Sequence, residues 1–155
     1  MPGVQVRHAA LTDLDALCAL EQVAFEQQDQ FSRRAIRYLL KSQNLVLVAV
    51  TDEQVLGQVT VLFRATSSRG RIYSLAVDPE ARGRGIAHIL LRAAEGETVA
   101  RNGTRLGLEV RSTNMRAQQI YSLAGYEVLG VKRDYYPDGE AAVIMEKNLL
   151  SPQAK

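Results

Sequence analysis

The fold is decided by the stretch Val77-Asp78-Pro79-Glu80-Ala81-Arg82-Gly83-Arg84-Gly85-Ile86-Ala87. An apolar, β-branched run at residues 72–77 leads into it and predicts a strand that ends by Pro79, because proline cannot donate a hydrogen bond to a sheet. A turn with two glycines and two arginines follows, and apolar residues then recur at helical spacing from Ile86. A strand, a glycine-rich turn and a helix start together present free backbone N–H groups and a positive dipole end. The stretch therefore predicts a site for a pyrophosphate.

Length and composition predict one globular domain. The chain has 155 residues, of which 46% are hydrophobic and 23% charged, with a formal net charge of +2; these proportions are typical of a soluble globular protein. We expect a single domain over residues 1–150 and a disordered tail over 151–155. The net charge is too small to predict a nucleic-acid partner. The arginines gather only between Arg69 and Arg84, which favours a small anionic ligand.

Cysteine content and hydropathy predict a cytoplasmic location. Cys18 is the single cysteine, so no intramolecular disulfide can form and a reducing compartment fits. The first residues lack the apolar core of a signal peptide, and no run of about 18 apolar residues indicates a membrane span. We therefore expect no membrane partner.

His8 and His88 have no further ligand residues at useful spacing, so we expect no metal site.

The rest of the sequence predicts a mixed α/β sheet of about seven strands with about four helices. Strands are expected at residues 4–8, 45–50, 55–63, 72–77, 106–110, 126–131 and 141–145. Helices are expected at residues 12–25, 32–40, 86–101 and 114–123. The order β-α-α-β-β-β-α-β-α-β-β implies parallel crossovers through the last two helices.

Single residues mark several of these boundaries. Thr12, Ser32 and Asn114 are expected to cap helices, since their side-chain oxygens can accept bonds from free N–H groups. The pair Asn102-Gly103 is expected to end the third helix in a left-handed conformation. Gly57, inside a predicted strand, indicates a bulge or a close approach of another segment.

Three kinds of glycine-rich phosphate motif could explain the turn. A P-loop requires Gly-Lys-Ser/Thr, which the sequence does not contain. A dinucleotide fingerprint would place its third glycine at His88, and Leu106 stands near the position of the acidic ribose partner expected about 20 residues later. The third pattern, Arg/Gln-x-x-Gly-x-Gly/Ala, matches Arg82-Gly83-Arg84-Gly85-Ile86-Ala87.

This third pattern, after a Val-Asp-Pro strand end, resembles the GCN5-related N-acetyltransferase (GNAT) superfamily. Further segments resemble its ribosomal-protein-alanine (RimI-like) branch; they are Leu108-Glu109-Val110-Arg111, Asn114-Met115-Arg116-Ala117, Ile120-Tyr121, Gly125-Tyr126 and Tyr135-Tyr136. The resemblance covers roughly residues 46–149. It implies a single-domain GNAT fold in which acetyl-CoA lies in a splay between the two central parallel strands.

The resemblance also implies acetyl-CoA as the co-substrate, without a metal, and assigns the turn to its pyrophosphate. Glycine at positions 83 and 85 would let the backbone N–H groups approach the phosphates closely. The implied binding residues of the turn are Arg82, Gly83, Arg84, Gly85, Ile86 and Ala87. The exposed edge of Leu75, Ala76 and Val77 would pair with the pantetheine arm. Asn114 is both a helix cap and a candidate contact to the pantetheine or substrate region.

Glu109 and Tyr121 are the candidate catalytic residues. An α-amino group, with a pKa of about 8, must lose a proton before it attacks, and Glu109 is an acidic residue in an otherwise apolar strand. A departing thiolate needs a proton, and a phenol is a suitable donor because the two pKa values lie close, at about 8.5 and 10. In RimI-like enzymes the glutamate matching Glu109 is the general base, and the tyrosine matching Tyr121 lies near the sulfur. Tyr135 and Tyr136, beside Pro137, are candidate substrate contacts.

The expected reaction is direct transfer of an acetyl group from acetyl-CoA to a primary amine, foremost the N-terminal α-amino group of a protein or peptide. Many RimI-like chains carry a Phe-Pro-Trp type segment between the first two helices, where this chain has Phe25-Glu26-Gln27-Gln28-Asp29-Gln30-Phe31. A small-molecule amine therefore stays an alternative acceptor, which an acidic pocket would favour. A non-catalytic acetyl-CoA-binding module is a second alternative, although such a module needs neither Glu109 nor Tyr121. The sequence leaves the oligomeric state open.

Overall fold

A computed structural model of the chain describes residues 3–52 and 54–150, so the tail expected at 151–155 lies outside the described residues. The strands are β1 (Gln5–His8), β2 (Leu45–Thr51), β3 (Gln54–Phe63), β4 (Arg69–Val77), β5 (Arg105–Arg111), β6 (Glu127–Lys132) and β7 (Ala142–Asn148). The helices are α1 (Leu14–Ala24), α2 (Arg33–Lys41), α3 (Ile86–Ala100) and α4 (Met115–Leu123), with 3-10 helices at Leu11–Asp13, Gln27–Asp29 and Pro79–Ala81. The predicted order of strands and helices is confirmed.

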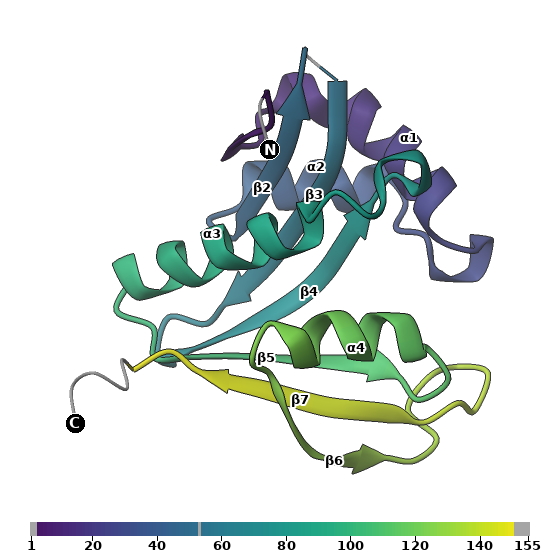
Figure 1. The fold of residues 1–155 in the computed structure, drawn as a ribbon, viewed down its shortest axis with the longest axis vertical. Coiled ribbons are helices and arrows are strands. Elements are labelled where there is room, and N and C mark those ends of the chain that lie inside the picture. Colours follow the sequence, from purple (N-terminus) through teal and green to yellow (C-terminus); the bar gives the residue numbers. More distant parts are fainter. Residues whose placement is uncertain (1–2, 53, 151–155) are drawn as a thin grey trace. The chain divides into compact units, whose positions relative to one another are not determined.

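The strands hydrogen-bond in the order β1-β2-β3-β4-β5-β7-β6 (Figure 1). β4 and β5 pair in parallel, as a crossover through α3 requires, and their recorded pairs run from Arg69↔Arg105 to Arg71↔Gly107. β5 pairs antiparallel with β7, and β7 pairs antiparallel with β6. β6 therefore runs parallel to β5, as expected for a crossover through α4, but β7 lies between them.

The chain divides into two compact units, each described here by itself. The first consists of Met1–Phe63 and Tyr73–Ala94, and the second of Arg64–Ile72 and Glu95–Lys155. β4 contributes its first residues to the second unit and its remaining residues to the first. That residues 1–150 form a single domain stays a prediction.

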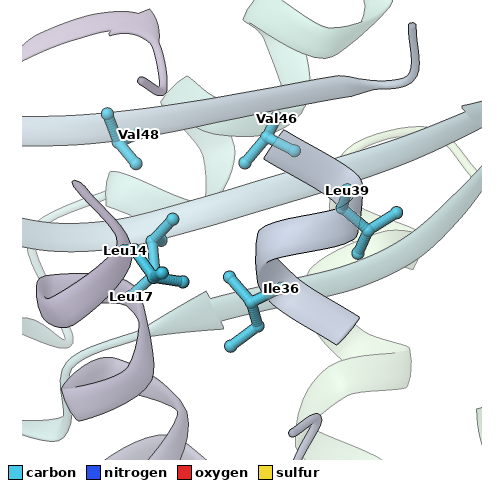
Figure 2. Packing of buried hydrophobic residues seen from close by; sticks show 6 residues of the cluster. All are labelled: Leu14, Leu17, Ile36, Leu39, Val46 and Val48. Atoms are coloured by element: carbon cyan, nitrogen blue, oxygen red, sulfur yellow. The ribbon is translucent and has the colours of Figure 1, made fainter. Parts of the chain in front are cut away.

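In the first unit, α1 and α2 bury their apolar faces against β2 (Figure 2). The buried side chains of this cluster are Leu14, Leu17, Ile36, Leu39, Val46 and Val48. Ser32 caps α2 as predicted, because its Oγ accepts the Ala35 N–H at 3.1 Å. The prediction that Thr12 caps the first helix is wrong. Thr12 lies inside a 3-10 helix, whose start is held instead by Asp13, which accepts the Ala10 N–H at 2.7 Å.

At Gly57 the structure shows both a strand irregularity and a close approach of other segments, the two features that a glycine inside a strand indicated. The register of β2 against β3 shifts between Ala49 and Val50, opposite this part of β3. A Cβ at position 57 would lie 2.9 Å from the Ala76 carbonyl oxygen and 3.2 Å from Cγ2 of Ile86. The missing side chain therefore lets β3 lie close to both β4 and the first turn of α3.

In the second unit, β5 alternates between a buried and a polar face. Leu106, Leu108 and Val110 are buried, whereas Glu109 and Arg111 project from the opposite face. α3 ends at Ala100, and the left-handed exit predicted at Asn102-Gly103 occurs at Asn102, whose φ is 66°. Within residues 3–52 and 54–150, no helix is both long and apolar enough to cross a bilayer.

Candidate functional site

The C-terminal end of β4 is fixed by the hydrogen bonds of Asp78, the residue that follows it. The Asp78 N–H donates to the Leu56 carbonyl oxygen at 2.8 Å. The Asp78 carboxylate accepts the Glu80 N–H at 2.9 Å and so caps the 3-10 helix that begins at Pro79. β4 therefore ends at Val77, where the sequence predicted, and the chain leaves it in a defined direction.

The glycine-rich turn has a backbone that requires its two glycines. Gly83 has a φ of 84° and Gly85 a φ of 76°, a region that side chains with a Cβ rarely adopt. No heavy atom lies within 4 Å of the position that a Cβ would take at either glycine. The space over the turn is therefore open to a ligand, which the sequence-based interpretation requires.

The start of α3 adds the N–H groups of a helix end to the turn. The Gly85 carbonyl oxygen accepts the Ile89 N–H at 3.0 Å, so the helix starts at this residue. The N–H groups of the first turn, including Ile86 and Ala87, then lack partners within the helix, and the dipole is positive at this end. Ile86 is itself only 1% exposed, so its side chain anchors the turn. The arginines Arg82 and Arg84 are exposed on the turn.

Glu109 lies in a cluster of polar side chains in the second unit. Its side chain is only 12% exposed, and its Oε1 accepts a hydrogen bond from Nε of Arg71 at 2.8 Å. A second nitrogen of the same guanidinium, Nη2, donates to the Tyr135 hydroxyl at 3.3 Å. The structure therefore brings two residues singled out from the sequence, Glu109 and Tyr135, onto one arginine.

Tyr136 contacts a different arginine, Arg111, and the ring of Tyr135. Its ring lies under the guanidinium of Arg111, 4.2 Å from the ring centroid, and it meets Tyr135 edge to face. Arg111 also pairs with Asp138 at 2.9 Å and with Glu140 at 3.3 Å. The Glu140 backbone N–H lowers the pKa of Asp138, and Arg111 adds to this effect. These contacts give the loop after β6 a defined conformation.

Tyr121 is buried on the inner face of α4. Its residue is 7% exposed, and its ring meets that of Tyr126 edge to face at 5.7 Å between centroids. Burial raises the pKa of the Tyr121 phenol, with a smaller contribution from the nearby Tyr136. The phenol therefore stays protonated throughout the neutral pH range. The same shift widens the gap between phenol and thiol pKa values that the sequence suggested would be small.

Asn114 shows one of its two expected roles. Its Oδ1 accepts the Ala117 N–H at 3.0 Å, which makes it the N-cap of α4. The side-chain oxygen is thus used within the protein. A contact from Asn114 to a bound ligand stays a prediction.

The arginines from Arg69 to Arg84, whose clustering suggested a small anionic ligand, have different surroundings in the structure. The first two pair with carboxylates of the protein, whereas Arg82 and Arg84 are exposed on the turn. Arg69 pairs with Glu146 at 2.9 Å, and Arg71 with Glu109. Arg71 was not identified from the sequence, because its partner lies 38 residues away and no local pattern links the two. His88 lies exposed on α3.

No group of three or more His, Cys, Asp or Glu side chains that could hold a metal ion occurs in the described part of the chain. The first unit contains one set of candidate residues, the turn and the end of β4. The second unit contains another set, formed by Glu109, Arg71, Tyr121 and the tyrosine loop, the loop after β6 that carries Tyr135 and Tyr136.

Comparison with known proteins gives matches over most of the chain. The model of the acetyltransferase (GNAT) family matches residues 9–126. The [ribosomal protein bS18]-alanine N-acetyltransferase of Salmonella typhimurium is 34% identical over 143 residues, which cover 86% of this chain and 90% of that protein.

Solved structures show the same fold. The ribosomal-protein-S18-alanine N-acetyltransferase from Escherichia coli aligns with a TM-score of 0.84 at 24% identity, covering 96% of this chain and 95% of the other. The PaiA N-acetyltransferase from Thermoplasma acidophilum, solved in complex with coenzyme A, aligns with a TM-score of 0.79 at 19% identity, covering 94% and 98%.

Proposed function

This chain belongs to the acetyltransferase (GNAT) family, and we propose that it transfers an acetyl group from acetyl-CoA directly to the N-terminal α-amino group of a protein or peptide. The observation that carries the proposal is the carboxylate of Glu109, shielded from solvent and joined through Arg71 to the tyrosine loop. The likeness over most of the chain to an enzyme named for acetylating a ribosomal protein's alanine supports the choice of acceptor.

The turn Arg82–Ala87 is the part of the chain that suits the pyrophosphate of acetyl-CoA. Its left-handed glycines leave open space above the backbone, and the first N–H groups of α3 point out of the helix end. Arg82 and Arg84 add positive charge beside this helix end. Leu75, Ala76 and Val77 offer backbone groups for the pantetheine arm. A backbone N–H of this strand is also the proposed donor to the oxyanion that forms at the thioester.

Glu109 is the proposed proton acceptor for the attacking amine. An amine must be neutral to attack, and a carboxylate within reach, directly or through water, accepts its proton. The bond from Arg71 uses one position on Oε1, while a carboxylate has about four lone-pair sites on its two oxygens. Glu109 therefore keeps the capacity to accept a proton while Arg71 holds it in place.

Tyr121 is the proposed donor of a proton to the departing thiolate. Its raised pKa keeps the phenol protonated before the reaction. A thiolate that leaves into the same dry site is destabilised by burial as well, which raises the pKa of the thiol and favours its protonation. Cys18 packs as a partly buried side chain against the core of the first unit, so it is not proposed as an acyl carrier.

The charges near Glu109 favour a single amine over a polyamine as acceptor. Glu109 is balanced by Arg71, and Arg111 is balanced by Asp138 and Glu140. Lys132, whose ammonium lies 5.8 Å from the Tyr135 ring centroid, balances the remaining carboxylate of the three. This part of the site therefore has no excess of carboxylates to attract a second ammonium group. Tyr135 and Tyr136 provide aromatic area and hydroxyl groups suited to a peptide. We place the reaction in the cytoplasm, which agrees with the lone Cys18.

An acceptor panel read by CoA release tests the proposal. It contains peptides that begin with alanine, serine, glycine or methionine, together with spermidine and kanamycin as small amines. We expect CoA release with at least one free peptide and none with the same peptide blocked at its N-terminus. Transfer only to the small amines would establish the alternative acceptor class. Binding of CoA with no transfer to any amine would indicate a binding module.

A further inference from the structure

We propose that Arg71 is a positioning residue. Its single guanidinium group fixes both the proposed base Glu109 and the tyrosine loop, which carries Tyr135. The inference rests on the function proposed above and adds a residue that acts through Glu109 and Tyr135. It starts from an arginine in β4 that bonds both a residue of β5 and a residue of the loop after β6.

The geometry of the guanidinium suits this double role. Nε donates to Glu109 at 2.8 Å and Nη2 donates to Tyr135 at 3.3 Å, so two different nitrogens of one planar group make the two bonds. A fixed planar fork relates the directions of these two bonds, so movement of one partner affects the other. The ammonium of a lysine is a single point and cannot reproduce both directions.

The strand register explains why Arg71 reaches Glu109. In the parallel pairing of β4 with β5, Arg71 lies beside Gly107, two residues before Glu109 on the same face of β5. Gly107 has no side chain to block this face, and a Cβ there would collide with the guanidinium of Arg69. Arg69 crosses Gly107 to reach Glu146, which leaves Glu109 to Arg71.

The side chains differ in exposure in a way that fits a positioning role. The Glu109 side chain is 12% exposed, whereas that of Arg71 is 44% exposed. The Glu109 carboxylate keeps one orientation because its donor, Arg71, is charged. Losing a charge-assisted hydrogen bond costs more free energy than losing a neutral one. Arg71 thereby restricts the direction from which Glu109 can accept a proton, and geometry of this kind contributes to rate.

Kinetics of Arg71→Ala test the role, with Arg105→Ala as the matched control. Arg105 lies on the same face of β5 and pairs with Glu146 at 2.9 Å, but touches neither Glu109 nor Tyr135. With an alanine-initiated peptide as acceptor, we expect Arg71→Ala to lower kcat at least about 10-fold and to raise the KM of the peptide. The KM of acetyl-CoA should change less than about twofold, and Arg105→Ala should retain both kcat and KM.

Two further variants separate the two contacts. Tyr135→Phe should raise the peptide KM by a larger factor than it lowers kcat, because it removes a hydroxyl from the loop but leaves the bond from Arg71 to Glu109. Arg71→Lys should restore part of kcat through its charge on Glu109 and leave the peptide KM raised. In the double variant Arg71→Ala/Glu109→Gln, kcat should be no more than about twofold below that of Glu109→Gln alone, because Arg71 acts through Glu109. Additive losses would overturn this part of the inference.

Limited trypsin digestion tests the loop contact without any acceptor. Lys132 and Arg133 precede the loop, so cleavage there reports how firmly Tyr135 is held. We expect faster cleavage in Arg71→Ala and Tyr135→Phe than in the parent chain and in Arg105→Ala. Equal rates in all four would overturn the contact between Arg71 and the loop.

The two proposals fail in different ways. If the parent chain acetylates peptides and Arg71→Ala is as active as the parent, only the role of Arg71 is refuted. If the parent chain acetylates no amine, the proposed function is refuted, and the digestion still decides whether Arg71 holds the loop.

Discussion

Tyr121 and Tyr126 meet edge to face in the second unit, with ring centroids 5.7 Å apart, yet their hydroxyl groups have different environments. The Tyr126 hydroxyl donates to Glu95 at 3.0 Å, and Glu95 also pairs with Lys147 at 3.0 Å. The Tyr121 phenol is instead the proposed proton donor of the reaction. Of these two adjacent buried tyrosines, Tyr126 has a structural contact and Tyr121 the proposed catalytic role.

The pair of variants Tyr121→Phe and Tyr126→Phe separates these tasks. Tyr121→Phe should lower kcat about 10-fold or more and change the free energy of unfolding little, since the ring is kept. Tyr126→Phe should keep kcat and lower the free energy of unfolding by about 1–2 kcal/mol, because a hydrogen bond to a charged acceptor is lost. Steady-state kinetics and urea unfolding measure both quantities. The reverse result would exchange the two roles.

Glu109→Gln tests the proposed base. The amide keeps the shape of the side chain but cannot accept the amine's proton, so we expect kcat to fall about 100-fold or more. Glu146→Gln is the matched control, because Glu146 is equally shielded at 12% and also bonded to arginines. CoA binding by calorimetry should stay unchanged in both variants. A Glu109→Gln variant with full turnover would remove the base from the proposal.

Gly85→Ala tests the turn, with Gly96→Ala of the same helix as its control. Gly85 has a φ of 76°, so a Cβ there is strained although the space around it is open. We expect Gly85→Ala to lower the free energy of unfolding by about 1–2 kcal/mol and to weaken CoA binding. Gly96 lies inside α3 with open space around it, so alanine should stabilise the chain by about 0.5–1 kcal/mol. Unchanged CoA affinity in Gly85→Ala would argue against the turn as the pyrophosphate site.

Glu21 predicts a pH dependence of stability. Burial raises its pKa above the ordinary 4.5, while the Phe31 N–H, which donates to it at 2.9 Å, opposes the shift. The folded chain therefore binds this proton more tightly than the unfolded chain, so the contribution of Glu21 to stability falls as pH rises above 4.5. Glu21→Gln keeps an oxygen acceptor for Phe31 and removes the titration.

Urea unfolding between about pH 4.5 and pH 7.5 measures this effect. The stability of Glu21→Gln relative to the parent chain should increase with pH across this range. Glu26→Gln, at an exposed position, is the control for removing a carboxylate outside the core. A constant difference between Glu21→Gln and the parent would contradict the predicted sign.

The sequence predicted the elements well because their signals are local. Ser32 and Asn114 cap helices through bonds to the residues that follow them three positions later. Thr12 failed as a cap because a contact to Asp13, itself bonded to Arg7 at 2.8 Å, holds the start of the first helix in a 3-10 conformation. Arg7, a residue of β1, thus helps to fix the carboxylate that holds this start.

The arginines show the same limit at the candidate site. Their spacing between Arg69 and Arg84 suggested one function, but the structure separates them into ion pairs and the turn. Likewise, the shielding that raises the pKa of Tyr121 comes from packing and not from neighbours in sequence. Neither result follows from residue type or spacing.

The sequence by itself determined the turn and the strand and helix that flank it. Proline at 79 ends the strand, and the glycines at 83 and 85 allow a left-handed backbone; both are properties of the residues themselves. Only the tertiary structure decided what Glu109 contacts. The parallel pairing of β4 with β5 brings Arg71 beside a carboxylate 38 residues away. Register between distant strands depends on the packing of the whole sheet, so it specified the partner of the base where residue spacing could not.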